Sequence, residues 1–222
     1  MNSSPLGQEV FAHLQAKGLQ PDPAWLRNFL SSQRSSIPLP ALKQTAFFRV
    51  INGDITITLQ STPGSIFPGD ILNANIRERR IAGPVVAQVL DIEDIGRSRW
   101  SQVEALEADE RGETTKGREI IRVVPGEEGE TGQQKSAGPH KLLLQDAQGG
   151  RAYGIEISST EGIGLGMNIG AKIVLRDVTI ARGVLLLEPK CATVLGGKIE
   201  ELHKAWKDGR KEALKASARG RS

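Results

Sequence analysis

The run Val85-Val86-Ala87-Gln88-Val89-Leu90-Asp91-Ile92 decides the fold of this chain. It follows Pro84, and its apolar, largely β-branched residues are typical of a strand with little contact to water. Four more strand-like segments come later: short apolar runs at 142–144, 173–175 and 184–187, and an alternation of apolar and other residues at 153–157. The run at 184–187 is apolar throughout, so we expect it to be buried on both faces. Five short strands with no long helix between them predict a small antiparallel barrel, closed or nearly closed.

Three short amphipathic helices are predicted before the barrel. The first covers 8–17, and the second begins after Asp22-Pro23, which pairs an N-cap carboxylate with a proline at the first helical position. The third places its apolar residues on one face over 39–50. Next, Ile55, Ile57 and Leu59 alternate with threonines, and this periodicity favours a strand. We therefore expect an α+β chain, with a helical bundle over 1–64 and a barrel domain over 65–222.

Residues 96–138 form a long insertion between the first and second barrel strands, and connections of this length are generally functional or disordered. Twelve acidic and seven basic side chains lie within 91–138, whereas the whole chain has a net charge of +3. The insertion contains a short helical pattern and a second apolar island, and neither can bury itself alone. We predict that it contacts a partner protein, with Trp100 as the buried anchor that such interfaces favour. The candidate residues are Arg97, Arg99, Trp100, Val103, Leu106, Ile120, Ile121 and Val123.

A C-terminal helix is predicted over about 198–216, because apolar residues repeat there at helical spacing. Four basic residues of this helix are candidates for contacts with nucleic-acid phosphates: Lys204, Lys207, Arg210 and Lys211. Four acidic residues interrupt the basic stripe, so a solvated helix face is the alternative. Tyr153 is the only aromatic residue in the predicted strands, which is a thin supply for stacking bases.

Catalytic, metal and cofactor sites have no support in the sequence. The single cysteine, Cys191, excludes an intrachain disulfide and indicates a reducing compartment, and we expect it to be a small core residue. The three histidines are scattered, and Gly162–Gly170 lacks the third glycine of a dinucleotide-binding loop. We expect no enzyme activity and no cofactor. No apolar run is long enough for a membrane span, and residues 1–17 lack the pattern of a signal peptide, so we expect a protein that is not exported.

The segment Gly183-Val-Leu-Leu-Leu-Glu-Pro189, followed by Val194-Leu-Gly-Gly-Lys-Ile199, closely resembles the RecQ-mediated genome instability protein 1 family. Three further segments also resemble the family: Pro68–Leu72, Gln88–Ile95 and Trp100–Leu106. The resemblance implies that the barrel is an OB-fold and that Ile55–Leu59 is helical rather than a strand.

The same resemblance implies a function. The chain would be a non-catalytic nuclear scaffold that binds topoisomerase III in a complex with a RecQ helicase, acting in DNA replication, DNA repair and homologous recombination. In that family the insertion reaches into the topoisomerase gate and favours dissolution of double Holliday junctions. A second hypothesis is an autonomous OB-fold protein that binds single-stranded DNA.

Overall fold

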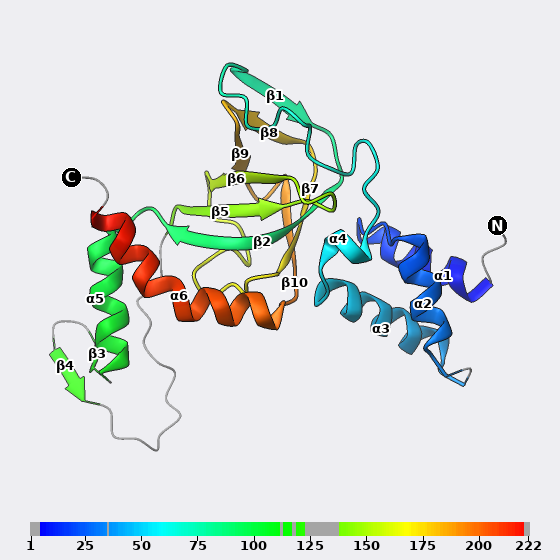
Figure 1. Cartoon of the computed structure of the whole chain (residues 1–222), viewed down its shortest axis with the longest axis horizontal. Helices are drawn as coiled ribbons and strands as arrows, with labels where there is room; N and C mark the ends of the chain where they lie inside the picture. Colours follow the sequence, from blue (N-terminus) through cyan, green and yellow to red (C-terminus); the bar gives the residue numbers. More distant parts are fainter. Residues whose placement is uncertain (1–4, 35, 112, 117–118, 123–137, 220–222) are drawn as a thin grey trace.

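The computed structural model describes residues 5–34, 36–111, 113–116, 119–122 and 138–219. In Figure 1 the N-terminal helices lie at one end, a curled sheet occupies the middle, and two long helices lie at the other end. None of the helices in the described ranges combines the length and the apolar character that crossing a bilayer requires.

Four helices build the N-terminal part: α1 (Pro5–Ala16), α2 (Pro23–Ser31), α3 (Leu39–Ile51) and α4 (Ile55–Thr58). The three predicted amphipathic helices are confirmed, and Asp22 caps α2 by accepting hydrogen bonds from the backbone N–H groups of Ala24 and Trp25 at 2.8 and 2.9 Å.

The strand that alternation favoured over Ile55–Leu59 is wrong, because Ile55–Thr58 form helix α4 and Leu59 alone is extended, as the residue that ends the helix. Asp54 Oδ1 accepts the N–H of Thr56 at 2.9 Å and so starts a helical turn. Ile55 is buried while Ile57 is exposed, so the alternating residues do not share a face. The helical conformation implied by the family resemblance is confirmed.

Eight strands form the main sheet: β1 (Glu78–Ile81), β2 (Val85–Asp94), β5 (His140–Gln145), β6 (Arg151–Glu156), β7 (Lys172–Leu175), β8 (Val178–Ala181), β9 (Val184–Leu187) and β10 (Ala192–Gly196). Their order is β1-β8-β9-β6-β5-β2-β7-β10, and the sheet curls around its core as an open half-barrel (Figure 1). A separate hairpin, β3 (Glu113–Lys116) with β4 (Glu119–Arg122), lies within the insertion.

The prediction of five antiparallel strands is therefore wrong in two respects. It missed β1 and β10, and it did not separate β7 from β8. The strand β1 reads Glu-Arg-Arg-Ile and carries almost no apolar signal. In addition, β6 and β9 pair in parallel, with Tyr153 opposite Val184.

The apolar run of β9 is buried on only one face, contrary to the prediction. Leu185 and Leu187 are fully buried, whereas Val184 and Leu186 are partly exposed. This alternation indicates that the outer side of β9 is not covered by another layer.

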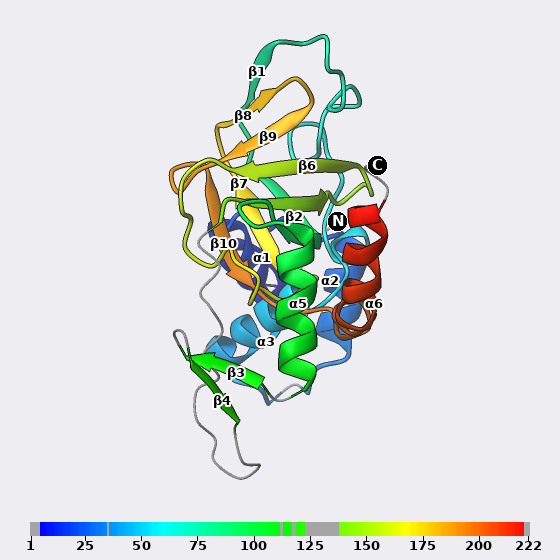
Figure 2. The same cartoon turned by 90° about the vertical axis from the view of Figure 1, so that its left-hand side faces the viewer.

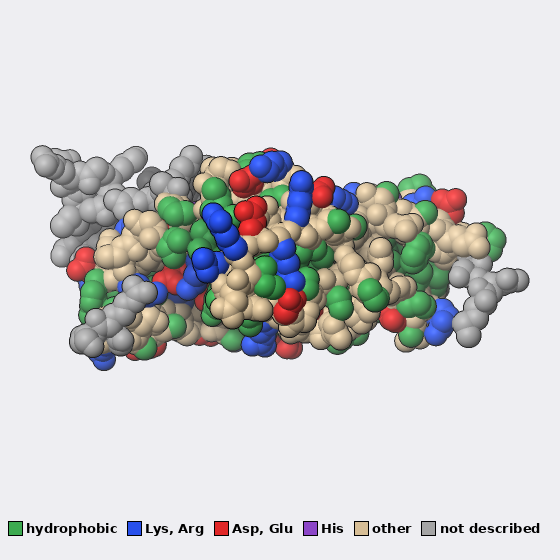
Figure 3. All heavy atoms as spheres, turned by 90° about the horizontal axis from the view of Figure 1, so that it is seen from above, with side chains coloured by type: hydrophobic (Ala, Val, Ile, Leu, Met, Phe, Trp, Pro, Cys, Tyr) green, Lys and Arg blue, Asp and Glu red, His purple; other side chains and the backbone are tan. Residues whose placement is uncertain are grey.

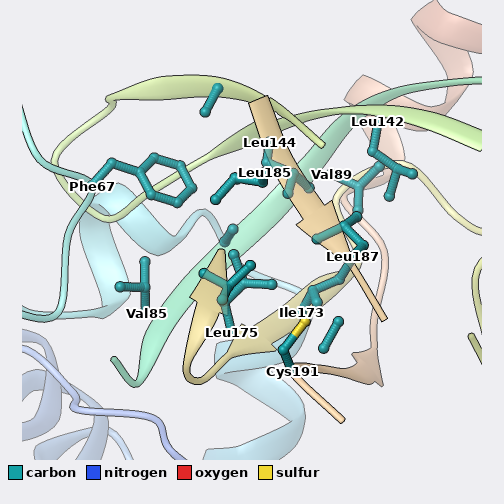
Figure 4. Close-up of a cluster of buried hydrophobic side chains, with 14 of the residues drawn as sticks. Phe67, Val85, Val89, Leu142, Leu144, Ile173, Leu175, Leu185, Leu187 and Cys191 are labelled. Carbon is teal, nitrogen blue, oxygen red and sulfur yellow. The ribbon is translucent and has the colours of Figure 1, made fainter. Parts of the chain in front are cut away.

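The barrel core is a cluster of mainly aliphatic side chains that point toward one another from several strands of the curled sheet, as Figure 4 shows. Fully buried members include Val85, Leu144 and Leu187. Cys191 is 6% exposed within this cluster, which confirms the prediction of a small core residue.

A second core fills the helical bundle, and the sheet contributes to it. Val86, Ala147 and Val174 of the barrel domain pack with the buried side chains of α1–α4. A polar seam adds to this joint, since Gln88 Nε2 donates to Asp54 Oδ1 at 3.3 Å and to Gln145 Oε1 at 2.9 Å. Lys172 is fully buried beside this joint, with its ammonium group donating to the carbonyl of Gly170.

Two further helices complete the fold: α5 (Arg99–Glu110) in the insertion and α6 (Glu200–Arg219) at the C-terminal end. The structure confirms both the short helix predicted in the insertion and the C-terminal helix. The two helices lie side by side against the end of β2 (Figure 2).

Candidate functional site

The insertion leaves the barrel after β2 and returns at β5, and its two ends touch. The N–H of Ile95 donates to the carbonyl of Pro139 at 2.9 Å. Gly96 lies so close to Gly138 that a Cβ on Gly96 would overlap the Gly138 carbonyl oxygen. We call residues 94–111 together with 138–140 the insertion root. The root is therefore a closed base whose position is fixed by the sheet.

Helix α5 begins with a capped and charge-paired first turn. Ser98 Oγ accepts the N–H of Ser101 at 3.1 Å, which is an N-cap hydrogen bond. Arg99 Nε donates to Glu93 Oε1 at 2.8 Å, and Lys141 Nζ lies 3.1 Å from Glu93 Oε2. Burial alone would raise the pKa of Glu93, but Lys141 and Arg99 together lower it. The carboxylate therefore stays ionised as a bridge between α5 and β5.

The inner face of α5 rests on the sheet through Gln102 and Val103, which are 3% and 2% exposed. Gln102 Nε2 donates to the carbonyl oxygens of Asp94 and Arg97 at 2.8 and 3.2 Å. Gln102 Oε1 has no hydrogen-bond partner within the described part of the chain. The side-chain amide thus fixes the start of α5 against the end of β2.

The outer face of α5 is open. Trp100 is 49% exposed, and Ile95, just before the helix, is 42% exposed. A large aromatic side chain exposed on a fixed helix is a feature that protein interfaces use as an anchor.

Helix α6 is fastened to the barrel before it reaches α5. Trp206 Nε1 donates to Asp91 Oδ1 at 2.7 Å, and the N–H of Ile169 donates to His203 Nδ1 at 3.1 Å. The Arg210 guanidinium lies 4.8 Å above the Trp206 ring, which is a cation–π contact. Burial lowers the pKa of Arg210, while Asp91 and Asp94 oppose that shift.

Ion pairs join α6 to α5 further along. Lys211 Nζ lies 2.6 Å from Glu110 Oε2, and Lys215 Nζ lies 2.9 Å from Glu107 Oε1. The hydrogen bond and charge of Lys215 lower the pKa of Glu107, and Glu107 in turn raises the pKa of Lys215.

A groove of about 310 Å³ lies between α5, α6 and the end of β2. Its polar walls come from Asp91, Glu93, Arg99 and Arg210, and small residues of α6 line its other side. These charged groups already have partners inside the protein: Glu93 pairs with Arg99, and Asp91 and Arg210 both contact Trp206.

The predicted partner-binding residues separate into two groups. Arg99 and Val103 face the fold, and Arg97 Nη2 donates to Ser101 Oγ at 3.2 Å. Trp100 faces outward, and Leu106 is partly exposed. Ile120 and Ile121 lie on β4, in register with Thr115 and Thr114 of β3. Val123 lies outside the described residues.

The predicted phosphate-binding residues also separate. Lys204 and Lys207 are exposed and form no ion pair within the described ranges. Arg210 stacks on Trp206, and Lys211 is paired with Glu110. The second half of the basic stripe is therefore committed to contacts inside the protein.

The buried pair of His140 and Glu156 was not identified from the sequence. His140 Nδ1 lies 2.5 Å from Glu156 Oε2, and both residues are nearly inaccessible. Glu156 also accepts the N–H groups of His140 and Thr160, so its oxygens are occupied by the fold. The two residues lie on neighbouring strands, which separation along the chain does not reveal. No group of three potential metal ligands occurs among the residues that the structure describes.

Comparison with known proteins gives two family matches. Residues 67–210 match the model described as "RMI1, N-terminal OB-fold domain", and residues 14–58 match "RMI1, N-terminal helical domain". The OB-fold expected from the resemblance is thereby confirmed.

Two relatives are both named RecQ-mediated genome instability protein 1. The protein from Schizosaccharomyces pombe is 33% identical over 141 residues, covering 56% of this chain and 60% of the relative. The protein from Mus musculus is 25% identical over 186 residues, covering 81% of this chain and 28% of the relative. In each case the match covers less than two thirds of the relative's length.

Proposed function

This chain belongs to the RMI1 family, and from that membership we propose that it is a non-catalytic scaffold subunit acting in genome stability. Its partners in this proposal are a topoisomerase III and a RecQ-family helicase, and its location is the nucleus. The insertion modulates the topoisomerase gate and thereby promotes dissolution of double Holliday junctions.

The observation that carries the proposal is the construction of the insertion root. Its base is fixed to the sheet by the contacts of Ile95, Gln102 and Arg99, while Trp100 on the same helix is half exposed. A scaffold subunit that acts on a partner protein needs a segment that is fixed to the fold at its base and exposes apolar side chains to the partner. The arrangement supports a protein partner at this position.

Deletion of 97–137 tests the proposal directly. Since Gly96 and Gly138 already touch, the two ends can be joined without displacing β2 or β5. We expect the shortened protein to lose most of its effect on decatenation by topoisomerase III. Circular dichroism controls for folding. If both binding and decatenation are unchanged, the insertion has no such role.

A point substitution isolates the anchor. We expect Trp100→Ala to weaken topoisomerase III binding by about 2 kcal/mol, because a truncated aromatic anchor typically costs this much. Phe48→Ala is the matched control, since Phe48 is a 63% exposed aromatic residue on α3, outside the insertion. Calorimetry showing equal affinities for the two variants would remove Trp100 from the interface.

Binding of single-stranded DNA is the second candidate function, and one observation favours it. Tyr153 is 46% exposed on β6, with the Lys141 ammonium 5.1 Å from its ring centroid. Other cations are less available, however. Basic side chains gather over the β1–β8 end with acidic ones among them (Figure 3), and Arg79 and Arg80 there pair with Asp70 and Asp177.

Fluorescence anisotropy with a labelled oligonucleotide decides between the two functions. Binding that falls steeply as salt rises would support DNA contact, because phosphate contacts release counterions. Absence of binding at low salt would exclude an autonomous DNA-binding role.

A further inference from the structure

Helix α6 contacts the barrel with its first half and helix α5 with its second half. Its first half is fastened to the barrel by Trp206 and His203. Its second half lies along α5 and pairs with it through Lys211 and Lys215. The helix therefore bridges the rigid sheet and the first helix of the insertion.

Charge along the two helices is complementary where they meet. Glu107 and Glu110 are three residues apart on α5, and Lys211 and Lys215 are four residues apart on α6, so each pair lies on one side of its helix. Lys211 Nζ contacts both carboxylate oxygens of Glu110, at 2.6 and 2.8 Å. Lys215 also lies 3.6 Å from Glu212, but that contact stays within α6.

We propose that α6 is a positioning element, in which Lys211 and Lys215 hold Glu110 and Glu107 and so set the direction of α5 relative to the barrel. The inference rests on the proposed function, because the direction matters only if the insertion acts on a partner. It assigns Lys211 and Lys215, in the second half of α6, to an intramolecular clamp rather than to nucleic acid.

The geometry explains why a clamp is needed at this place. Within the described ranges, the buried residues of α5 are Gln102 and Val103, both in its first half. The second half of α5 has no buried side chain, and hairpin strand β3 follows it and contacts it. Without α6, the helix would be fixed at its start and free to swing at its end.

Exposed ion pairs are individually weak and are screened by salt. Two ion pairs in the second half of α5 can nevertheless restrict the angle between α5 and the barrel, since they act far from the fixed start of the helix. The clamp is therefore expected to bias the orientation of α5 with little effect on the stability of the barrel.

Charge exchange between the helices gives a direct test. The reversed variant is Lys211→Glu with Lys215→Glu, which places four carboxylates between α5 and α6. The exchanged variant adds Glu107→Lys and Glu110→Lys, which restores opposite charges. The matched control is Lys204→Glu with Lys207→Glu, an equal change in charge at exposed positions of the same helix that form no ion pair with the residues that the structure describes.

The orientation of α5 is followed through the distance between two spin labels, which electron spin resonance measures. The labels are attached at Asp109→Cys on α5 and Arg151→Cys on β6, in a Cys191→Ala background. We expect a narrow distance distribution in the parent protein, a broad one in the reversed variant, and narrow ones again in the exchanged variant and the control. An unchanged distribution in the reversed variant would overturn the clamp.

Binding to topoisomerase III is the second measurement. We expect the reversed variant to bind about fivefold more weakly and the exchanged variant to recover, as two surface pairs would allow. Equal affinities despite a broadened distribution would overturn the link to the partner. If the parent protein itself does not bind, the proposed function fails, while the label distances still decide whether α6 orients α5.

Discussion

The barrel core and the insertion root hold their residues in place by different forces. In the core, aliphatic side chains such as Leu144 and Leu187 are fully buried against one another. In the root, α5 is held mainly by side-chain amide, carboxylate and guanidinium groups, with Val103 as its buried apolar residue. Apolar burial responds little to salt, whereas exposed charge pairs are screened by it. The barrel therefore provides a constant platform for a root whose geometry can be adjusted by charge.

The largest effect is expected in the core. Leu187→Ala should lower the free energy of unfolding by about 3 kcal/mol or more, because it removes a fully buried side chain that packs tightly against β6. Denaturant titration followed by tryptophan fluorescence measures this loss. Leu202→Ala is the control, since Leu202 is 36% exposed on α6. Similar losses for the two variants would contradict the contrast between core and surface.

The buried lysine makes one part of the barrel sensitive to pH. Burial lowers the pKa of Lys172 to about 8, although Asp54 acts in the opposite direction. An unfolded lysine titrates near pH 10.4, so between these values the folded chain binds fewer protons than the unfolded chain, and stability rises with pH. We expect a gain of about 2 kcal/mol between about pH 7.5 and about pH 9.5.

Lys172→Met isolates this contribution, because it removes the charge and keeps an unbranched side chain that is only one atom shorter. Urea titrations of both proteins at the two pH values give the difference. A rise of equal size in the variant would show that other groups cause the pH dependence.

A smaller effect is expected where the insertion meets the sheet. Gly96→Ala places a methyl group against the backbone carbonyl of Gly138, so the two ends of the insertion must separate. We expect a loss of about 1.5 kcal/mol, in the range of other overpacking substitutions. Gly69→Ala is the control, because no atom lies within 4 Å of its added Cβ. If both variants unfold at the same temperature, the close approach of Gly96 to Gly138 does not contribute to stability.

The smallest effect is expected at the N-cap of α5. Ser98→Ala removes the acceptor for the N–H of Ser101, and a lost cap costs about 1 kcal/mol. Ser98→Asn keeps an acceptor and should retain most of that stability. If the two variants are equally destabilised, the N-cap hydrogen bond of Ser98 does not account for the loss of stability.

Local signals predicted much of the fold. Asp22-Pro23 marks the start of α2, and the apolar spacing around Trp100 and Trp206 predicts α5 and α6. Each of these signals depends on residues within a few positions of one another. The family resemblance corrected the one helix, α4, for which periodicity was misleading.

Contacts between distant residues were not predictable from the sequence. The charged strand β1 pairs with β8, about a hundred residues later, and the β6–β9 pairing is parallel. At the candidate site, the spacing of Glu107 and Glu110 was visible, but their partners on α6 were not. The pairing of Lys211 also shows why a basic stripe overstates the charge available to a ligand.

The shared core of the helical bundle bears on how the chain is made. During synthesis the helices of residues 5–58 leave the ribosome first, yet their core includes Val86 and Val174 of the sheet. Until Val174 has been synthesised and β7 has paired with β2, the apolar faces of α1–α4 lack part of their cover. The N-terminal helices must therefore wait for more than a hundred later residues, and this interval is when the nascent chain most needs protection from aggregation.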